Sequence, residues 1–147
     1  MKTTIHRIAA AAMALLMAGA ATANNWKDVD YVGDGLTGHK LDIYTPDDGQ
    51  STHKVVVLIY GSAWFSNNSK VDAFKSYGQQ LLDAGFAVVS INHRASTEAK
   101  FPAQIQDVKA AIRYVRGNAS KYGLDTSFIG ITGYSSGGHL SSLAGTT

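Results

Sequence analysis

The sequence of 147 residues contains no cysteine, and this absence excludes several kinds of chemistry. Disulfide bonds, thiolate nucleophiles and cysteine-ligated metal sites are all ruled out. The five histidines are scattered along the chain, without the spacing that is typical of a metal site. We therefore expect neither a bound metal nor another cofactor.

An excess of charge of one sign is also lacking. The chain has 13 basic and 11 acidic residues, and the two numbers are equal once Lys2 and Arg7 near the N-terminus are set aside. The sequence therefore has no basic patch, and neither a nucleic acid nor an anionic membrane is predicted as a partner. Hydrophobic residues make up 45% and charged residues 16%, which is typical of a globular domain and not of a disordered chain.

The N-terminal residues have the pattern of an export signal. A basic start precedes an apolar stretch over residues 8–20, and Ala21-Thr22-Ala23 then matches an A-x-A cleavage site. An apolar run of about 13 residues is shorter than the ~20 that span a bilayer, which favours cleavage over a membrane anchor. We expect a signal peptide over residues 1–23, a mature domain over residues 24–147, and a secreted or periplasmic protein without membrane attachment.

Three apolar runs predict strands that are buried on both faces of a parallel sheet. They cover residues 55–60, 86–91 and 128–132. The earlier segment from Trp26 to Pro46 alternates apolar and polar residues, which predicts two short strands joined at the turn Gly33-Asp34-Gly35.

Amphipathic segments that alternate with these runs predict three helices, over residues 69–84, 102–122 and 136–144. The first helix is expected to begin with a capping box between Ser69 and Asp72. This alternation predicts an α/β fold, in which a mostly parallel sheet carries helices on both faces. Functional residues in such a fold gather at the carboxyl ends of the strands.

One of these strand ends carries a nucleophile motif. Gly133-Tyr134-Ser135-Ser136-Gly137 is a G-x-S-x-G pattern between an expected strand and an expected helix. In that context the turn is tight enough to raise the Ser135 hydroxyl above the sheet, and Gly133 and Gly137 leave room for the neighbouring chain. The N–H of Ser136 at the helix start would donate to an oxyanion. A plain helix cap rich in glycine and serine is the alternative interpretation.

A second oxyanion donor is expected from another strand end. Gly61-Ser62-Ala63 follows the strand that ends at Tyr60, and its small residues allow the backbone N–H groups to approach a substrate. A simple connection between strand and helix is the alternative interpretation of this loop.

Together these segments resemble the α/β-hydrolase superfamily, and most closely its secreted feruloyl- and acetyl-xylan-esterase-like branch, near the hormone-sensitive-lipase-like esterases. The resemblance covers most of residues 41–147. Leu41 to Pro46 is similar to the family's second strand, and Tyr60-Gly61-Ser62-Ala63-Trp64 is similar to its H-G-G-x-W loop. Residues 91–107 resemble its Y-R-x-x-x-E…F-P-A…D stretch, which leads to the G-x-S-x-G motif.

The resemblance implies an α/β-hydrolase fold with Ser135 as the nucleophile. It also implies an oxyanion hole made by the backbone N–H groups of Ser62, Ala63 and Ser136. Structural polar contacts near the site are expected from Arg94, Glu98 and Asp107. The sequence departs from the family pattern at four positions, where Tyr60 replaces His, Ser62 replaces Gly, His93 replaces Tyr and Thr97 replaces Pro.

The base and the acid of a serine hydrolase do not follow the nucleophile in this chain. The order in this fold is Ser, then Asp or Glu, then His, yet only His139 follows Ser135 and no acidic residue does. His139 lies one helical turn beyond the nucleophile and His93 precedes it, so we expect neither to be the base. We expect the chain to be the N-terminal part of a longer protein and to be inactive by itself.

The sequence thus predicts a serine hydrolase that cleaves carboxylic esters through an acyl-enzyme. A small-molecule ester or an acylated carbohydrate is the expected substrate. Two alternatives stay open. One is a peptidase of the prolyl-oligopeptidase type, which shares the nucleophile turn, and the other is a non-catalytic or truncated protein with the same fold.

Overall fold

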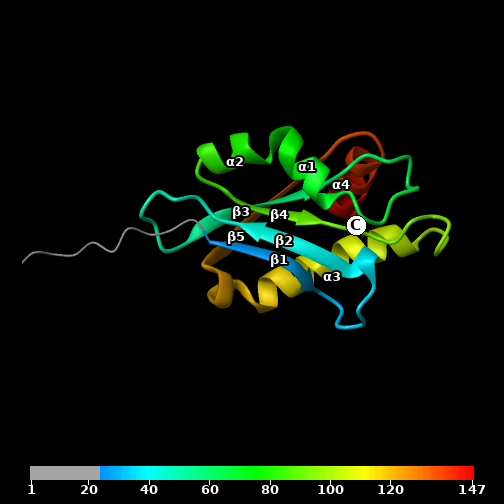
Figure 1. The fold of residues 1–147 in the computed structure, drawn as a ribbon, viewed down its shortest axis with the longest axis horizontal. Helices are drawn as coiled ribbons and strands as arrows, with labels where there is room; N and C mark the ends of the chain where they lie inside the picture. The colour runs from blue at the N-terminus through cyan, green and yellow to red at the C-terminus, as the bar shows by residue number, and fades with distance from the viewer. Residues whose placement is uncertain (1–23) are drawn as a thin grey trace, which may run out of the picture.

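The structure is a computed structural model that describes residues 24–147, so the predicted signal peptide lies outside the described residues. Its centre is a five-stranded sheet in the order β1-β2-β4-β3-β5 (Figure 1). The strands are β1 (Asn25–Asp30), β2 (Lys40–Tyr44), β3 (His53–Ile59), β4 (Ala87–Ile91) and β5 (Leu124–Gly133).

The direction of the strands confirms the mostly parallel sheet. β3 runs parallel to both β4 and β5, whereas β2 is antiparallel to both of its neighbours, β1 and β4. Only β2 is therefore reversed among the strands of residues 24–147. The carboxyl ends of β3, β4 and β5 consequently meet at one edge of the sheet.

Alternation along β3 explains why helices cover both faces of the sheet. Val55, Val57 and Ile59 pack in one hydrophobic core with α3 (Ala103–Gly117) and α4 (Ser136–Thr146). Leu58 belongs to the other core, which packs against the helix made of α1 (Lys70–Ala73), η2 (Phe74–Gly78) and α2 (Gln79–Asp83). Figure 1 shows α1 and α2 on one side of the sheet and α3 on the other. The predicted helices on both faces are confirmed.

The helix predicted over residues 69–84 forms, but its start and its middle differ from the expectation. The prediction of a capping box is wrong, because Ser69 makes no side-chain capping hydrogen bond. Its Oγ instead forms a hydrogen bond with Ser66 Oγ at 2.7 Å. Asn92 Oδ1, from the end of β4, accepts the Lys70 N–H at 3.1 Å and so caps the helix from outside. Its middle, η2, is a π-helical turn.

The helix predicted over residues 102–122 ends earlier, at Gly117. Asn118 turns its side-chain amide back onto the Tyr114 carbonyl at 2.9 Å, which competes with continuation of the helix. A short 3-10 helix, η3 (Ala119–Tyr122), follows, and Gly123 with φ 63° then leads into β5. Strand β5 therefore begins at Leu124, four residues before the apolar run that predicted it.

The glycine-rich turn between β1 and β2 is present as a longer connection. Asp30 accepts the N–H groups of Gly33 and Gly35, each at 2.7 Å, and these bonds hold the pKa of its carboxyl well below the ordinary value. Gly33 and Gly35 both have positive φ, which explains why glycine stands there. The 3-10 helix η1 (Thr37–His39) completes the connection. Within residues 24–147 no helix is long and apolar enough to cross a membrane.

Candidate active site

Ser135 occupies the turn between the end of β5 and the start of α4. Its backbone has φ 53° and ψ −121°, a conformation that a residue with a Cβ adopts only under strain. Tyr134 beside it is 74% exposed, so the turn stands out from the end of the sheet. This is the geometry expected of a nucleophile turn, in which a strained serine projects its hydroxyl away from the strand.

The two glycines of the motif allow this turn to lie directly against the end of β3. A Cβ on Gly137 would lie 2.5 Å from the Tyr60 carbonyl oxygen and closer still to that of Ile59. A Cβ on Gly133 would lie 2.7 Å from the Ile59 oxygen. Both distances are far inside van der Waals contact, so only glycine fits at these two positions.

A third glycine brings the loop after β3 against Ser135 itself. A Cβ on Gly61 would lie 2.5 Å from the Tyr134 carbonyl oxygen and 2.9 Å from Ser135 Cβ. The two motifs predicted from the sequence are therefore brought together in space, with the backbone of the loop in contact with the turn that carries Ser135.

The loop after β3, residues 61–65, has a strained backbone of its own. Ala63 has φ 49° and Trp64 has φ 63°, although neither is glycine. Two hydrogen bonds hold this shape: Phe65 N–H donates to the Ser62 carbonyl at 2.9 Å, and Ser96 N–H donates to the Trp64 carbonyl at 2.8 Å. These left-handed positions could not be predicted, because non-glycine residues rarely adopt them.

One predicted oxyanion donor has a partner in this structure. Ser62 N–H donates to Ser136 Oγ at 3.0 Å, while Ser62 Oγ accepts the Ser66 N–H at 3.2 Å. Within residues 24–147 the N–H groups of Ala63 and Ser136 make no such side-chain or loop hydrogen bond. The contact between Ser62 and Ser136 spans 74 positions of sequence, and no local pattern could have predicted it.

Tyr60 and His93, two departures from the family pattern, pack together beneath this loop. Their rings stack with centroids 4.7 Å apart, and the Tyr60 hydroxyl donates to the Ser66 carbonyl at 3.0 Å. His93 is fully buried, and burial lowers the pKa of its imidazole. Its Nδ1 lies 3.0 Å from the Arg94 carbonyl and must donate there, which leaves Nε2 as an acceptor without a partner in the described chain.

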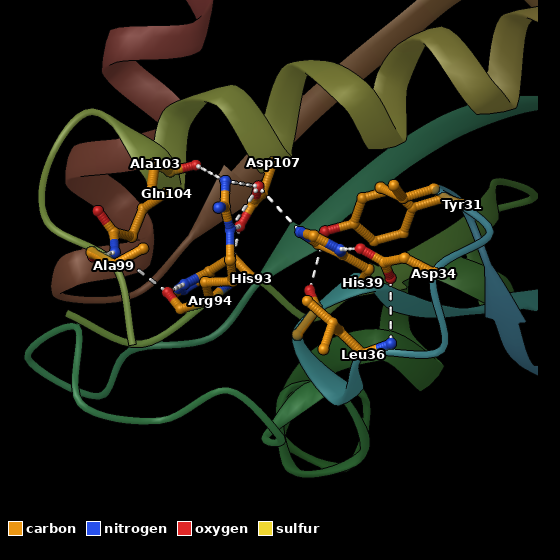
Figure 2. Close-up of polar contacts among 12 residues, drawn as sticks. Tyr31, Asp34, Leu36, His39, His93, Arg94, Ala99, Ala103, Gln104 and Asp107 are labelled. Carbon is orange, nitrogen blue, oxygen red and sulfur yellow. Dashed lines mark hydrogen bonds and ion pairs between the residues drawn. The ribbon is translucent and has the colours of Figure 1, made fainter. Parts of the chain in front are cut away.

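A partly buried ionic cluster supports the segment that follows β4 (Figure 2). Asp107, from the first turns of α3, accepts Arg94 Nη2 at 2.7 Å and Nε at 3.0 Å, and this pairing raises the pKa of Arg94. The same carboxylate lies 3.2 Å from His39 Nε2, and His39 Nδ1 lies 2.7 Å from Asp34. Arg94 and Asp107 therefore make the structural contacts that were expected, whereas sequence reasoning missed His39.

Glu98 also makes a structural contact, and it does so next to the strained loop. One carboxylate oxygen accepts the Ala95 N–H at 2.7 Å, and the other accepts the Asn67 side-chain amide at 2.6 Å. Together with the bond from Ser96 to Trp64, these contacts tie the segment after β4 to the loop after β3.

The two histidines considered near Ser135 are used for packing. The His139 ring lies edge-on to Trp64 with centroids 5.4 Å apart, and His93 is buried below the loop. Across residues 24–147, neither ring has a hydrogen bond to Ser135. That part of the chain also holds no group of His, Asp or Glu residues that could bind a metal ion.

Two cavities flank the loop after β3. One, of about 440 Å³, lies on the side of the α1–η2–α2 helix and is lined by polar and aromatic residues that include Asp72 and Tyr134. The other, of about 660 Å³, lies on the side of α4 and is mainly apolar, with Trp64, Phe65 and Phe101 in its wall.

Comparison with known proteins places these features in a family. Residues 41–147, which contain the loop after β3 and the Ser135 turn, match the BD-FAE family. The chain belongs to this family. The match begins at the first residues of β2 and includes each strand that follows it.

The proteins that are similar to this BD-FAE chain include esterases by name. The probable carboxylic ester hydrolase LipM of Mycobacterium tuberculosis is 42% identical over 122 residues, which cover 82% of this chain and 28% of LipM. The solved bifunctional GH43-CE protein of Bacteroides eggerthii is 71% identical with a TM-score of 0.83, covering 84% of this chain and 17% of that one.

A truncated form of a carbohydrate esterase from gut microbiota is 60% identical with a TM-score of 0.84, covering 88% of this chain and 45% of that one. These likenesses confirm the α/β-hydrolase fold and the esterase branch expected from the sequence. The chain spans less than half the length of each of the three proteins.

Proposed function

We propose that the complete protein to which this chain belongs is an exported serine esterase that cleaves carboxylic esters through an acyl-enzyme on Ser135. The observation that carries this proposal is the strained backbone of Ser135, at φ 53° between β5 and α4, pressed against the loop after β3. A simple helix cap does not need such strain, whereas an exposed nucleophile does.

In the proposed reaction, Ser135 Oγ attacks the ester carbonyl carbon while a base accepts its proton. The electron pair of the carbonyl moves onto its oxygen and gives a tetrahedral intermediate. When that pair returns, the bond to the alcohol breaks, the alcohol takes the proton from the base, and an acyl-enzyme remains. Water then attacks the acyl carbon, releases the carboxylic acid and restores the serine hydroxyl.

The developing oxyanion would be stabilised by backbone N–H groups from both sides of the turn. Ala63 N–H, from the strained loop, and Ser136 N–H, at the start of α4, are the donors without competing partners. Ser62 N–H would join them once its bond to Ser136 Oγ is released. Because α4 begins at Ser136, the positive end of its dipole favours the same negative charge.

The base and its acid are assigned to residues of the complete protein outside this chain. Two observations support that assignment: the only histidine after Ser135 packs on Trp64, and the chain covers 28% of its relative LipM. Export through the N-terminal signal, and acylated carbohydrates as substrates, belong to the same proposal. The carbohydrate esterase among the similar structures supports that substrate class.

The test is active-site labelling of the product of the complete reading frame. A fluorophosphonate should label the purified protein once, and mass spectrometry should find the adduct on the peptide that holds Ser135. Ser135→Ala should remove the label and the hydrolysis of 4-nitrophenyl acetate. Ser142→Ala, on an exposed position of the same helix, serves as the matched control and should retain both.

Two results would contradict the proposal. One is a folded wild-type protein that neither takes up the label nor cleaves the ester, which would favour the non-catalytic alternative. The other is a label that persists in Ser135→Ala, for example on Ser136. A peptidase would instead cleave peptide amides in preference to esters of the same acyl group.

A further inference from the structure

The helix that faces the Ser135 turn has an irregular middle. The π-helical turn η2 interrupts α1 and α2 between Phe74 and Gly78. Such turns occur frequently at functional sites, because the wider backbone displaces side chains from the regular helical positions. Ser76 lies within it and donates its hydroxyl to the Asp72 carbonyl at 2.9 Å.

The cavity of about 440 Å³ lies between this helix and the Ser135 turn, and its wall combines polar side chains with a larger share of apolar surface. Asp72, Ser76 and Tyr77 line it from the helix, and Gly61 and Tyr134 line it from the opposite side. These last two residues are in close contact with each other, and Gly61 also approaches Ser135 Cβ. A molecule that fills this cavity therefore lies beside the proposed nucleophile.

The lining combines polar groups with exposed aromatic surface. Asp72 is exposed, and among residues 24–147 its carboxylate has no ion pair or side-chain hydrogen bond, while the hydroxyl of Tyr77 is buried without a partner. Burial raises the pKa of Tyr77, and its protonated hydroxyl is a potential donor. A buried hydroxyl of this kind gains stability when a ligand or water supplies its partner. Tyr134, 74% exposed, offers a ring face above the same space.

The cavity on the other side of the loop is far more apolar. Trp64, Phe65 and Phe101 dominate its wall, so it suits an apolar group. A carboxylate that accepts from hydroxyl groups, beside aromatic surface for the C–H face of a ring, suits a molecule rich in hydroxyls. In a carbohydrate ester, the alcohol portion is a sugar of this kind.

We propose that the cavity between the α1–η2 helix and the Ser135 turn binds the carbohydrate alcohol of the ester substrate, with Asp72 as acceptor for its hydroxyl groups and Tyr134 as the ring face. This inference rests on the proposed esterase function and adds to it the place where the leaving group binds.

The test compares two acetates that differ only in the alcohol, using the protein from the complete reading frame. One is 4-nitrophenyl acetate, and the other is a mono-O-acetylated methyl β-xyloside. Asp72→Asn should lower the ratio of kcat/KM for the xyloside ester to that for the aryl ester by about tenfold or more, as expected for losing hydrogen bonds to a charged acceptor. It should also weaken competitive inhibition by methyl β-xyloside.

A matched control and a second variant keep the outcome clear. Asp83→Asn, at the far end of the same helix, removes a carboxylate that faces Gln79 at 2.8 Å and should leave the ratio as in wild type. Tyr134→Ala, at an exposed position, should lower the ratio as Asp72→Asn does.

The proposal is overturned if Asp72→Asn and Tyr134→Ala keep the wild-type ratio, or if Asp83→Asn lowers it equally. It is also overturned if wild type cleaves the aryl ester but not the xyloside ester, and in that case the esterase function stands. Failure of wild type on both esters, by contrast, removes the esterase function itself.

Discussion

Replacing Gly61 with alanine tests whether the contact between the two loops is required for catalysis. The added Cβ would lie 2.5 Å from the Tyr134 carbonyl oxygen and 2.9 Å from Ser135 Cβ. Because neither neighbour is the flexible end of a long side chain, the loop or the turn must move by about 1 Å to restore normal contact. Overpacking of this kind costs about 1–3 kcal/mol of stability. A displacement of about 1 Å between catalytic groups costs on the order of 100-fold in rate.

We therefore expect Gly61→Ala in the complete protein to lower kcat/KM for 4-nitrophenyl acetate about 100-fold, while urea denaturation shows a folded protein that is about 1–3 kcal/mol less stable. The matched control is Gly117→Ala, in the last turn of α3, where a Cβ meets nothing within 4 Å. That control should keep wild-type activity. Activity within twofold of wild type in Gly61→Ala would show that the approach of the loop to Ser135 is not needed.

Three further predictions concern the surroundings of the site. Asp107→Ala leaves Arg94 and His39 without their buried partner, and should lower the free energy of unfolding by about 3–5 kcal/mol in urea denaturation; a loss below about 1 kcal/mol would contradict this role. Burial lowers the pKa of His93 below 6.5, so the unfolded state binds more protons and stability should fall as pH drops below about 6.5. His93→Gln should flatten that dependence, and an unchanged pH profile of unfolding would argue against it. Ser136→Ala removes the acceptor of Ser62 N–H and should cost about 1 kcal/mol of stability while the label on Ser135 is retained; loss of the label would assign Ser136 a larger role.

The parts of the fold that could be predicted are those encoded by neighbouring residues. The apolar run at 55–60 predicted β3 to within two residues, because a strand buried on both faces needs a continuous apolar sequence. The Ser135 turn could be located for the same reason, since a strand, a G-x-S-x-G motif and a helix follow one another along the chain.

The parts that could not be predicted depend on residues far apart in sequence. Ser69 does not cap the helix, because Asn92, which directly follows β4, supplies the acceptor for the Lys70 N–H. His39 lies 68 positions from Asp107, and nothing local to either residue indicates that they meet. The strain in the loop after β3 was missed because it falls on Ala63 and Trp64, residue types that give no sign of a left-handed backbone.

Three glycines, at positions 61, 133 and 137, share one packing contact between the end of β3 and the Ser135 turn. Positions that share a contact do not respond independently to substitution, because the first displacement already opens the space that a second would need. The cost of losing two of these glycines should therefore be smaller than the sum of the single losses. The backbone path past Ser135 is therefore set by the three positions together and not by any one of them.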